Sequence, residues 1–258
     1  MHEDPAVVAR LRAAGCVFAE EEAQVLAAAA RTADELESMV ERRVRGLPLE
    51  QVVGWAEFCG LRILVDPGVF VPRLRSEFLV KTAVAVSVIR SPVVVDLCCG
   101  TGALGLAVIA KLGGGELHAA DVDPAAVACA RRNVEPAGGC VYSGDLYAPL
   151  PSELRGRVTT LLCNAPYVPT SEIDLLPAEA RDYEHRVALD GGDDGLAVLR
   201  RAASQAPEWL APGGHLLVET SGRQASLMGD VMTAAGLTSR IHECADYDSA
   251  VVSGTMSA

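Results

Sequence analysis

Two short runs of residues contain the groups best suited to chemistry. Residues 93–102 read Val-Val-Val-Asp-Leu-Cys-Cys-Gly-Thr-Gly, an apolar strand that ends in an acid and a glycine-rich turn. Residues 161–167 read Leu-Leu-Cys-Asn-Ala-Pro-Tyr, which places a carboxamide, a proline and an aromatic ring at the tip of another strand. The first run is typical of a turn that approaches a cofactor, and the second is suited to holding a planar nitrogen.

Three acids follow three successive predicted strands. Asp96 ends the first strand, Asp121 ends the second, and Asp145 follows the third. The carboxyl ends of parallel strands meet at one edge of a sheet, where ligands of such folds bind. Asp121 lies about twenty residues beyond the glycine turn, a position from which a carboxylate accepts both hydroxyls of a ribose. Asp145 is placed to meet an adenine amino group, so the three acids predict an adenosine-containing cofactor.

The glycine turn favours a cofactor without phosphates. Gly100 and Gly102 remove side chains where a backbone has to approach a ligand. The turn lacks the third glycine of G-x-G-x-x-G, and Asp96 either fixes the turn or accepts from a cationic amino group. S-adenosylmethionine carries no phosphate and is cationic at sulfur, so we expect it to be the cofactor. Taken alone, the turn is also compatible with a plain α/β connection.

The second run predicts how a nitrogen is held. The Asn164 oxygen and a following backbone carbonyl can accept the two hydrogens of an amide or exocyclic amine, and Tyr167 can pack on the planar group. Such a nitrogen is a poor nucleophile and needs alignment with the methyl donor. The two runs together predict methyl transfer to nitrogen. The plainer alternative is a turn built by Asn164 and Pro166 at a strand end.

Alternating elements from residue 76 onward predict the scaffold that positions these groups. Apolar strands are expected over 93–97, 116–121, 140–142, 158–163 and 215–220. Amphipathic helices are expected over 76–89, 103–112, 124–134, 194–209 and 224–235. Such an alternation indicates a mainly parallel sheet covered on both faces. The last segments, 237–243 and 249–254, are too close for a crossover helix and should pair antiparallel at one edge.

The N-terminal part differs from the rest of the chain in its sequence pattern. Alanine-rich stretches with helical spacing occupy 5–14 and 19–31, and Thr32 to Glu35 has the spacing of a capping box for a third helix. Short apolar runs over 57–71 predict a hairpin. We divide the chain into a helical cap over 1–50, a hairpin linker over 51–75 and an α/β domain over 76–258.

Composition limits the partners and the compartment. The 258 residues carry 22 basic and 34 acidic side chains, a net charge of −12 without a basic block, so direct nucleic-acid binding is not expected. None of the eight cysteines forms a C-x-x-C pair, and neither a disulfide framework nor a metal site is predicted. No run reaches membrane-spanning length and no secretory start is visible, so no membrane contact is expected and the cytoplasm is the expected compartment.

As an ordered set, the motifs resemble the protein-(glutamine-N5) methyltransferases, whose best-known members methylate the glutamine of the Gly-Gly-Gln loop in class I peptide release factors. The resemblance covers most of the chain. It is carried by Arg43 with Gly46-Leu-Pro48, Gly54 to Phe58, Val71-Pro72-Arg73 with Glu77, residues 96–102, Asn164 to Tyr167, Tyr183 to Arg186, Ala188 to Leu196, and Pro212 to Glu219. The family implies a Rossmann-like class I methyltransferase sheet with an antiparallel terminal hairpin, and a small N-terminal helical domain that docks the substrate.

The resemblance also implies roles for individual residues. Catalytic residues are expected at Asn164 and Tyr167. Cofactor-binding residues are expected at Asp96, Cys98, Gly100, Thr101, Gly102, Asp121, Val122, Asp145, Leu146 and Asn164. Substrate-binding residues are expected at Arg73, Glu77, Asn164, Ala165, Pro166 and Tyr167. The implied donor is S-adenosyl-L-methionine, and the implied partner is a release factor or another protein.

Three departures from the family pattern leave the acceptor open. The family's Asn-Pro-Pro-Tyr is here Asn164-Ala-Pro-Tyr167, which keeps the carbonyl of Ala165 but frees Asn164 from the restraint of a following proline. The family's Pro-Arg-Pro-Asp-Thr-Glu is here Pro72-Arg-Leu-Arg-Ser-Glu77, which puts Arg75 in the place of an acid, and the helical cap is short.

The main expectation is therefore methylation of glutamine N5 in a protein such as a release factor. The alternative is methylation of a free amino acid or small metabolite at an amide or guanidino nitrogen. A non-catalytic cofactor-binding or RNA-associated module fits poorly with the intact Asn164 and Tyr167 and with the acidic charge.

Overall fold

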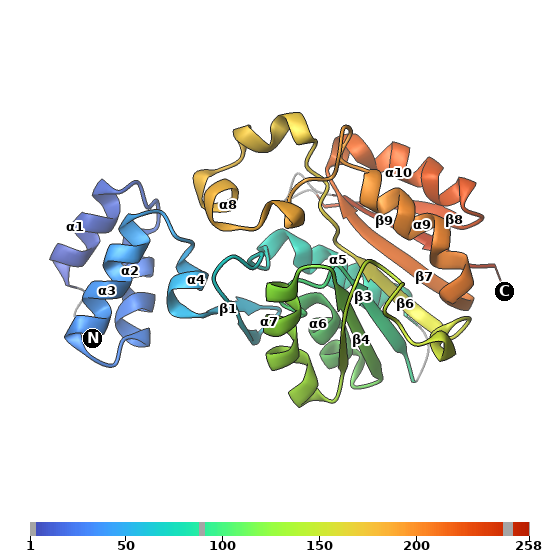
Figure 1. Ribbon diagram of the computed structural model, residues 1–258, viewed down its shortest axis with the longest axis horizontal. Helices are drawn as coiled ribbons and strands as arrows, with labels where there is room; N and C mark the ends of the chain where they lie inside the picture. The colour runs from blue at the N-terminus through green and yellow to red at the C-terminus, as the bar shows by residue number, and fades with distance from the viewer. Residues whose placement is uncertain (1–3, 88–90, 245–249, 258) are drawn as a thin grey trace.

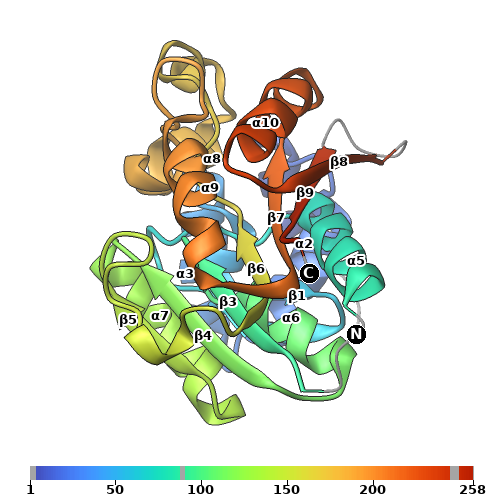
Figure 2. The ribbon, with the colours of Figure 1, turned by 90° about the vertical axis from the view of Figure 1, so that its right-hand side faces the viewer.

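The computed structural model describes residues 4–87, 91–244 and 250–257, and a seven-stranded sheet in the order β5-β4-β3-β6-β7-β9-β8 forms its centre (Figure 2). The strands are β3 (Val93–Leu97), β4 (Glu116–Asp121), β5 (Cys140–Ser143), β6 (Val158–Cys163), β7 (Leu210–Thr220), β8 (Thr238–Glu243) and β9 (Ala250–Thr255). β9 runs antiparallel to β7 and β8, and the other neighbouring strands are parallel. The predicted mainly parallel sheet with an antiparallel terminal pair is confirmed.

Helices cover both faces of this sheet. They are α5 (Glu77–Val86), α6 (Ala103–Leu112), α7 (Pro124–Val134), α9 (Ala197–Trp209) and α10 (Gly222–Ala234). Val93, Val95 and Leu97 pack in one core with α9 and α10, whereas Val94 packs in the other core with α5, α6 and α7. This alternation is expected of a strand that is buried on both faces. Within the described ranges, no helix is long and apolar enough to cross a lipid bilayer.

The predicted boundaries need small changes. The helix expected over 194–209 begins at Ala197, and β7 follows it directly from Leu210. The helix expected over 76–89 and the strand expected over 249–254 both extend into residues outside the described part of the chain.

The N-terminal helices form a core of their own beside the sheet (Figure 1). They are α1 (Pro5–Ala13), α2 (Ala19–Ala29), α3 (Ala33–Val44) and the short α4 (Leu49–Val53). The antiparallel hairpin of β1 (Trp55–Phe58) and β2 (Leu61–Leu64) follows. Asn133 of α7 accepts from the Leu64 amide and donates to the carbonyls of Leu64 and Thr101, each at 2.9 Å. One side chain thus ties the hairpin to the turn after β3.

A segment between β6 and α9 lies where the sequence pattern predicted no element. It contains the 3₁₀ turns Thr170–Leu175 and Arg186–Ala188 and the six-residue helix α8 (Ala178–Tyr183). Figure 1 shows α8 between the N-terminal helices and the sheet domain. Single bridges join Glu184 to Gly68 and Asp190 to Val168. The segment is therefore fastened at both ends beside the carboxyl edge of the sheet.

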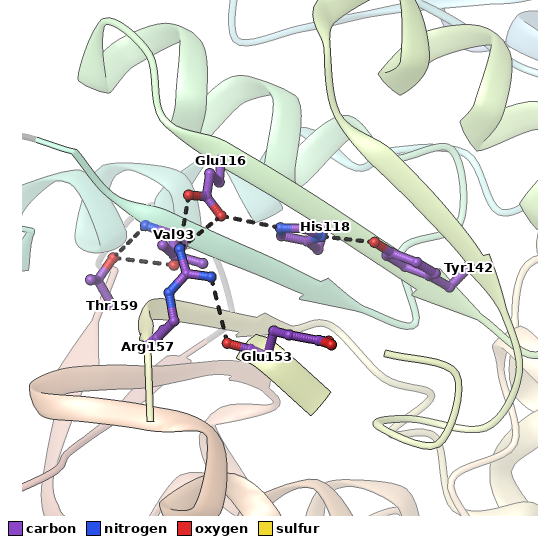
Figure 3. A network of polar contacts seen from close by, with 7 residues as sticks. All are labelled: Val93, Glu116, His118, Tyr142, Glu153, Arg157 and Thr159. Carbon is purple, nitrogen blue, oxygen red and sulfur yellow. Dashed lines mark hydrogen bonds and ion pairs between the residues drawn. The ribbon is translucent and has the colours of Figure 1, made fainter. Parts of the chain in front are cut away.

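A polar network ties strands together at the opposite, amino-terminal end of β4 (Figure 3). Arg157 Nη2 donates to Glu116 Oε1 at 2.9 Å, and Glu116 Oε2 lies 3.6 Å from His118 Nε2. His118 Nδ1 is 3.0 Å from the hydroxyl oxygen of Tyr142 on β5. Burial lowers the pKa of His118. This histidine is therefore part of the scaffold, at the far end of the strand from the site described next.

Candidate active site

A cavity of about 380 Å³ lies at the carboxyl ends of β3, β4 and β6. The turns after these strands supply Cys98, Cys99, Gly100, Thr101, Asp121, Val122, Asp123, Asn164, Ala165, Pro166 and Tyr167 to its wall. Ligands of open α/β sheets bind at this edge. The two runs that the sequence singled out therefore meet in one space.

The turn after β3 exposes its backbone to the cavity. Cys98 and Gly100 both have a φ of +54°, in the left-handed region that favours glycine. A Cβ at Gly100 would meet no other atom within 4 Å, so open space adjoins this backbone. The Gly100 amide donates to Asp121 Oδ2 at 2.8 Å. The turn is thus held from β4 and leaves space for a ligand to approach.

Asp121 is the charged group at this end of the cavity. Its Oδ1 accepts from the Asp123 amide at 2.9 Å, and its Oδ2 accepts from Gly100. Burial raises the pKa of Asp121, and the two amide donors oppose that rise by stabilising the carboxylate. A carboxylate offers about four lone-pair sites, so acceptor capacity is left for two hydroxyl donors. The half-exposed Val122 adds apolar surface beside it, and this end fits a ribose with its base.

Asp96 and Gly102 support the turn from behind. Asp96 is fully buried, and its Oδ2 accepts from the Gly105 amide at 2.9 Å in the first turn of α6. A Cβ at Gly102 would lie 2.5 Å from Val134 of α7, so close helix packing requires this glycine. Neither residue lines the cavity. Both residues support the turn in this structure, and the cofactor contact predicted for them stays a prediction.

Asp145 and Leu146 also lie outside this cavity. The Asp145 carboxylate pairs with Arg201 of α9, and Asp145 lines a second cavity of about 230 Å³. Leu146 is buried in the core beneath α9. The pair with Arg201 occupies one oxygen of the Asp145 carboxylate and leaves acceptor sites on this side chain. The cofactor contacts predicted for these two residues stay predictions.

Asn164 and Ala165 form the acceptor end of the cavity. The register of β6 against β3 pairs Cys163 with Leu97, so Asn164 follows β6 beside the turn that begins at Cys98. Asn164 Nδ2 donates to the Ser76 hydroxyl at 3.3 Å. None of the described residues donates to its carboxamide oxygen or to the Ala165 carbonyl. Two available acceptors match the two N–H groups of a planar amino group.

Two residues far away in sequence fix Tyr167. Arg75 Nη2 donates to the Tyr167 hydroxyl at 2.6 Å, and this hydroxyl donates to Glu219 Oε1 at 3.1 Å. Arg75 Nε donates to the same carboxylate oxygen at 3.2 Å. Burial, followed by the charge of Glu219, raises the pKa of Tyr167, so the hydroxyl stays protonated and can donate. Sequence reasoning found Tyr167 and the unusual Arg75 but missed Glu219.

Arg73 lies on the cavity wall, whereas Glu77 does not. Arg73 Nη2 donates to the buried Glu184 at 2.5 Å, and its guanidinium lies 4.9 Å from the centroid of the Phe70 ring. Glu77 instead accepts from the Cys59 amide at 2.9 Å and ties the hairpin turn to α5. This bond gives Glu77 a structural role, and the substrate contact predicted for it stays a prediction.

The α8 segment provides a wall that sequence reasoning missed. Buried Arg43 of α3 pairs with Glu22 of α2 at 2.6 Å and with Glu179 of α8 at 2.7 Å. The Tyr183 hydroxyl donates to the Arg45 carbonyl at 2.6 Å. The segment lines the cavity with Leu176, Pro177, Glu179, Ala180, Val187, Ala188 and Leu189. The N-terminal helices are thus coupled to the wall, and the sequence signals were Arg43 and the family motifs over 183–186 and 188–196.

Comparison with known proteins decides the family. The family model described as "Methyltransferase small domain" matches residues 60–179. A release factor glutamine methyltransferase of Geobacter sulfurreducens is 36% identical over 211 residues, which cover 80% of this chain and 70% of that protein. The chain belongs to the release factor glutamine methyltransferase family. It is an S-adenosylmethionine-dependent N-methyltransferase, as the two sequence runs predicted.

A second relative has a different name. The 4-amino-L-phenylalanine/4-methylamino-L-phenylalanine methyltransferase of Streptomyces pristinaespiralis is 33% identical over 203 residues, which cover 76% of this chain and 69% of that protein. Among solved structures, a methyltransferase from Pyrococcus furiosus matches with a TM-score of 0.60 and 14% identity, over 86% of this chain and 98% of that chain. The structural likeness confirms the Rossmann-like methyltransferase fold and no more, so the acceptor has to be argued from the site.

Proposed function

We propose that this chain transfers a methyl group from S-adenosylmethionine to the side-chain amide nitrogen of a glutamine in a protein, with a peptide release factor as the leading partner. One observation carries the proposal: Asp121 and Asn164, a carboxylate for a ribose and a carboxamide for a nitrogen, line the same cavity. Membership of the release factor glutamine methyltransferase family supports the same acceptor. We place the reaction in the cytoplasm, a compartment that suits eight free thiols.

The donor end of the cavity suits adenosine and the methionine part of the cofactor. Asp121 would accept from the ribose hydroxyls, and the backbone at Gly100 would lie against the cofactor. The bound donor supplies a methyl group on cationic sulfur: the nitrogen–carbon bond forms as the sulfur–carbon bond breaks, and the electron pair of the broken bond stays on sulfur.

The acceptor end compensates for a weak nucleophile. An amide lone pair is delocalised over the carbonyl, so the nitrogen has to be held in line with the methyl group. The Asn164 oxygen and the Ala165 carbonyl accept its two N–H groups, and the Tyr167 ring packs on its plane. Alignment of this kind lowers a barrier by roughly 7–11 kcal/mol at best. The methylated nitrogen then releases one proton to water and becomes a neutral amide.

A free amino acid with a planar side-chain nitrogen is a second candidate acceptor. Ala165 relaxes the turn that the family builds with proline. The relative from Streptomyces pristinaespiralis acts, by its name, on 4-amino-L-phenylalanine, whose exocyclic amine carries two N–H groups like an amide. Asn164 and Ala165 would hold either nitrogen in the same way.

The test is to locate the methyl group. Purified chain is incubated with methyl-labelled S-adenosylmethionine and a purified release factor, and peptides of the product are sequenced by mass spectrometry. We expect one methyl group on the glutamine of the Gly-Gly-Gln loop, and none on a release factor in which asparagine replaces that glutamine. If the chain binds the cofactor but labels no glutamine of the release factor, this acceptor is wrong.

A further inference from the structure

Arg75 is braced in a way that fixes the orientation of its guanidinium. Its Nε and Nη2 donate to Glu219 and to the Tyr167 hydroxyl, at 3.2 and 2.6 Å. The Glu219 side chain is only 2% exposed, and it also accepts from the Tyr167 hydroxyl. One edge of the planar guanidinium is thereby fixed by a buried anion and a phenol.

The rest of this guanidinium is available to a ligand. The Arg75 side chain is 41% exposed, and it lies on the wall of the cavity. Its Nη1 has no acceptor among the described residues. Arg73, on the same wall, differs because it is paired with Glu184, whose side chain is fully buried, and lies over Phe70. A guanidinium carries five N–H donors in a planar fork, so Arg75 retains donors for a planar, two-oxygen acceptor.

Arg75 lies next to the residues that form the acceptor end of the cavity. The guanidinium carbon lies 5.8 Å from the centroid of the Tyr167 ring, and the neighbouring Ser76 binds Asn164. A planar group held at Asn164 and packed on Tyr167 would therefore lie close to Arg75. The family pattern has an acid where Arg75 stands, and an acid there would repel a carboxylate that Arg75 attracts.

We propose that Arg75 binds a carboxylate of the acceptor, and that the site therefore also methylates a free amino acid with a planar side-chain nitrogen. This inference rests on the proposed transfer at Asn164 and assigns to Arg75 the recognition of the second candidate acceptor. The transfer itself is unchanged: the acceptor nitrogen gains the carbon–nitrogen bond, sulfur keeps the electron pair, and one nitrogen proton goes to water. Arg75 acts on binding and specificity, at a distance from the reacting atoms.

The experiment compares two acceptors that differ in one group. The first is 4-amino-L-phenylalanine, and the second is 4-(2-aminoethyl)aniline, which has the same aromatic amine but no carboxylate. We expect kcat/KM to be about 10-fold to 100-fold higher for the amino acid, as expected for a hydrogen-bonded charge. L-Glutamine and its α-methyl ester form a second pair for an acceptor with an amide nitrogen, with the same expected direction.

Variants assign the preference to Arg75. Arg75→Gln should remove the preference mainly through a higher KM for the amino acid, and Arg75→Lys should keep part of it because it keeps the charge but not the fork. Arg223→Gln is the matched control, and it should keep the full preference because Arg223 forms an exposed pair with Glu172 and does not line the cavity. Titration calorimetry with S-adenosylhomocysteine should give the same cofactor affinity for each folded variant.

Three outcomes would overturn the inference: no methylation of either amino acid, equal use of the paired acceptors by the wild type, or a preference that survives in Arg75→Gln. A release factor is assayed in parallel to separate the two proposals. Labelling of the release factor with no labelling of amino acids rejects the Arg75 inference and leaves the proposed function standing. Labelling of neither rejects both.

Discussion

The two ends of the cavity are built in different ways. The donor end consists of turns after the adjacent strands β3 and β4, and backbone amides of Gly100 and Asp123 hold its carboxylate, Asp121. The acceptor end gathers Arg75 and Glu219, which are 144 residues apart in sequence, around Tyr167. The donor is always S-adenosylmethionine, and a local turn is enough to bind it. The acceptor wall consists of side chains that are distant in sequence, and it can be altered one residue at a time.

This difference predicts that cofactor binding and acceptor choice are separable. Changes at the donor end should alter cofactor affinity while turnover at saturation remains. Changes at the acceptor end should alter turnover or the KM for the acceptor while cofactor affinity remains. Each of the following predictions tests one side of this separation.

The largest effect is expected at Asn164. Asn164→Ala deletes one of two acceptors that orient the nitrogen, so kcat should fall about 100-fold or more. Cofactor affinity, measured by titration calorimetry, should change by less than about threefold. Ser76→Ala is the matched control. It removes only the hydrogen-bond partner of Asn164 Nδ2, so it should lower kcat much less than Asn164→Ala does. Near-normal turnover in Asn164→Ala would show that this residue serves the turn alone.

A somewhat smaller effect is expected at Asp121. Asp121→Ala removes the acceptor of two ribose hydroxyls, so cofactor affinity should fall by about 1.5–3 kcal/mol. Glu208→Ala is the control, because Glu208 forms an exposed pair with Arg155 and does not line the cavity, and it should bind the cofactor nearly as well as wild type. The reverse ranking of the two variants in a calorimetric titration would place the adenosine elsewhere.

The buried acid behind the donor turn should make folding stability depend on pH. Burial raises the pKa of Asp96 to about 7 in the folded chain, from 3.8. Between these values the folded state binds more protons than the unfolded state, so the free energy of unfolding should fall as pH rises through this window. The free energy of unfolding should fall between pH 5.5 and 8, and Asp96→Asn should make this fall about 2 kcal/mol smaller. Urea unfolding at pH 5.5 and at pH 8 gives the free energy of unfolding of both proteins. If this free energy changes equally between the two pH values in wild type and in Asp96→Asn, the prediction is wrong.

The smallest effect is expected where the N-terminal helices meet the cavity wall. Glu179→Gln weakens the pair with Arg43, while Arg43 keeps its buried partner Glu22. Because the Glu179 side chain is 45% exposed, the pair is worth at most about 1 kcal/mol, and KM for the acceptor should rise up to about fivefold. Glu172→Gln, which affects only the exposed pair with Arg223, should leave KM unchanged. A changed cofactor affinity in Glu179→Gln would contradict the separation.

Sequence reasoning located those residues of the cavity whose positions are set by nearby sequence. The strand before the glycine turn, the open backbone at Gly100 and the carboxylate of Asp121 follow from apolar runs and turn chemistry within about 30 residues. Asp96 and Gly102 were found as part of the same motif, but their roles depend on how α6 and α7 pack against the turn. A sequence motif does not distinguish a residue that faces a ligand from one that supports it.

The acceptor wall was harder to predict because its pairs span the whole chain. The roles of Glu219 and Glu179 depend on their ion pairs with Arg75 and Arg43. No periodic sequence pattern connects residues that are so far apart in the chain. The segment over 164–196 contains only short helical turns, which are too brief to give a helical period. The signs of a changed acceptor site were Ala165, Arg75 and the short helical cap, each seen by comparison with the family pattern.

The most direct test of a two-ended cavity is a crystal structure of the chain with S-adenosylhomocysteine. We predict that the ribose hydroxyls lie within hydrogen-bond distance of the Asp121 carboxylate, and that the sulfur faces the Asn164 carboxamide across the cavity. An adenosine bound beside Asp145 in the second cavity, or a sulfur that points away from Asn164, would contradict the account.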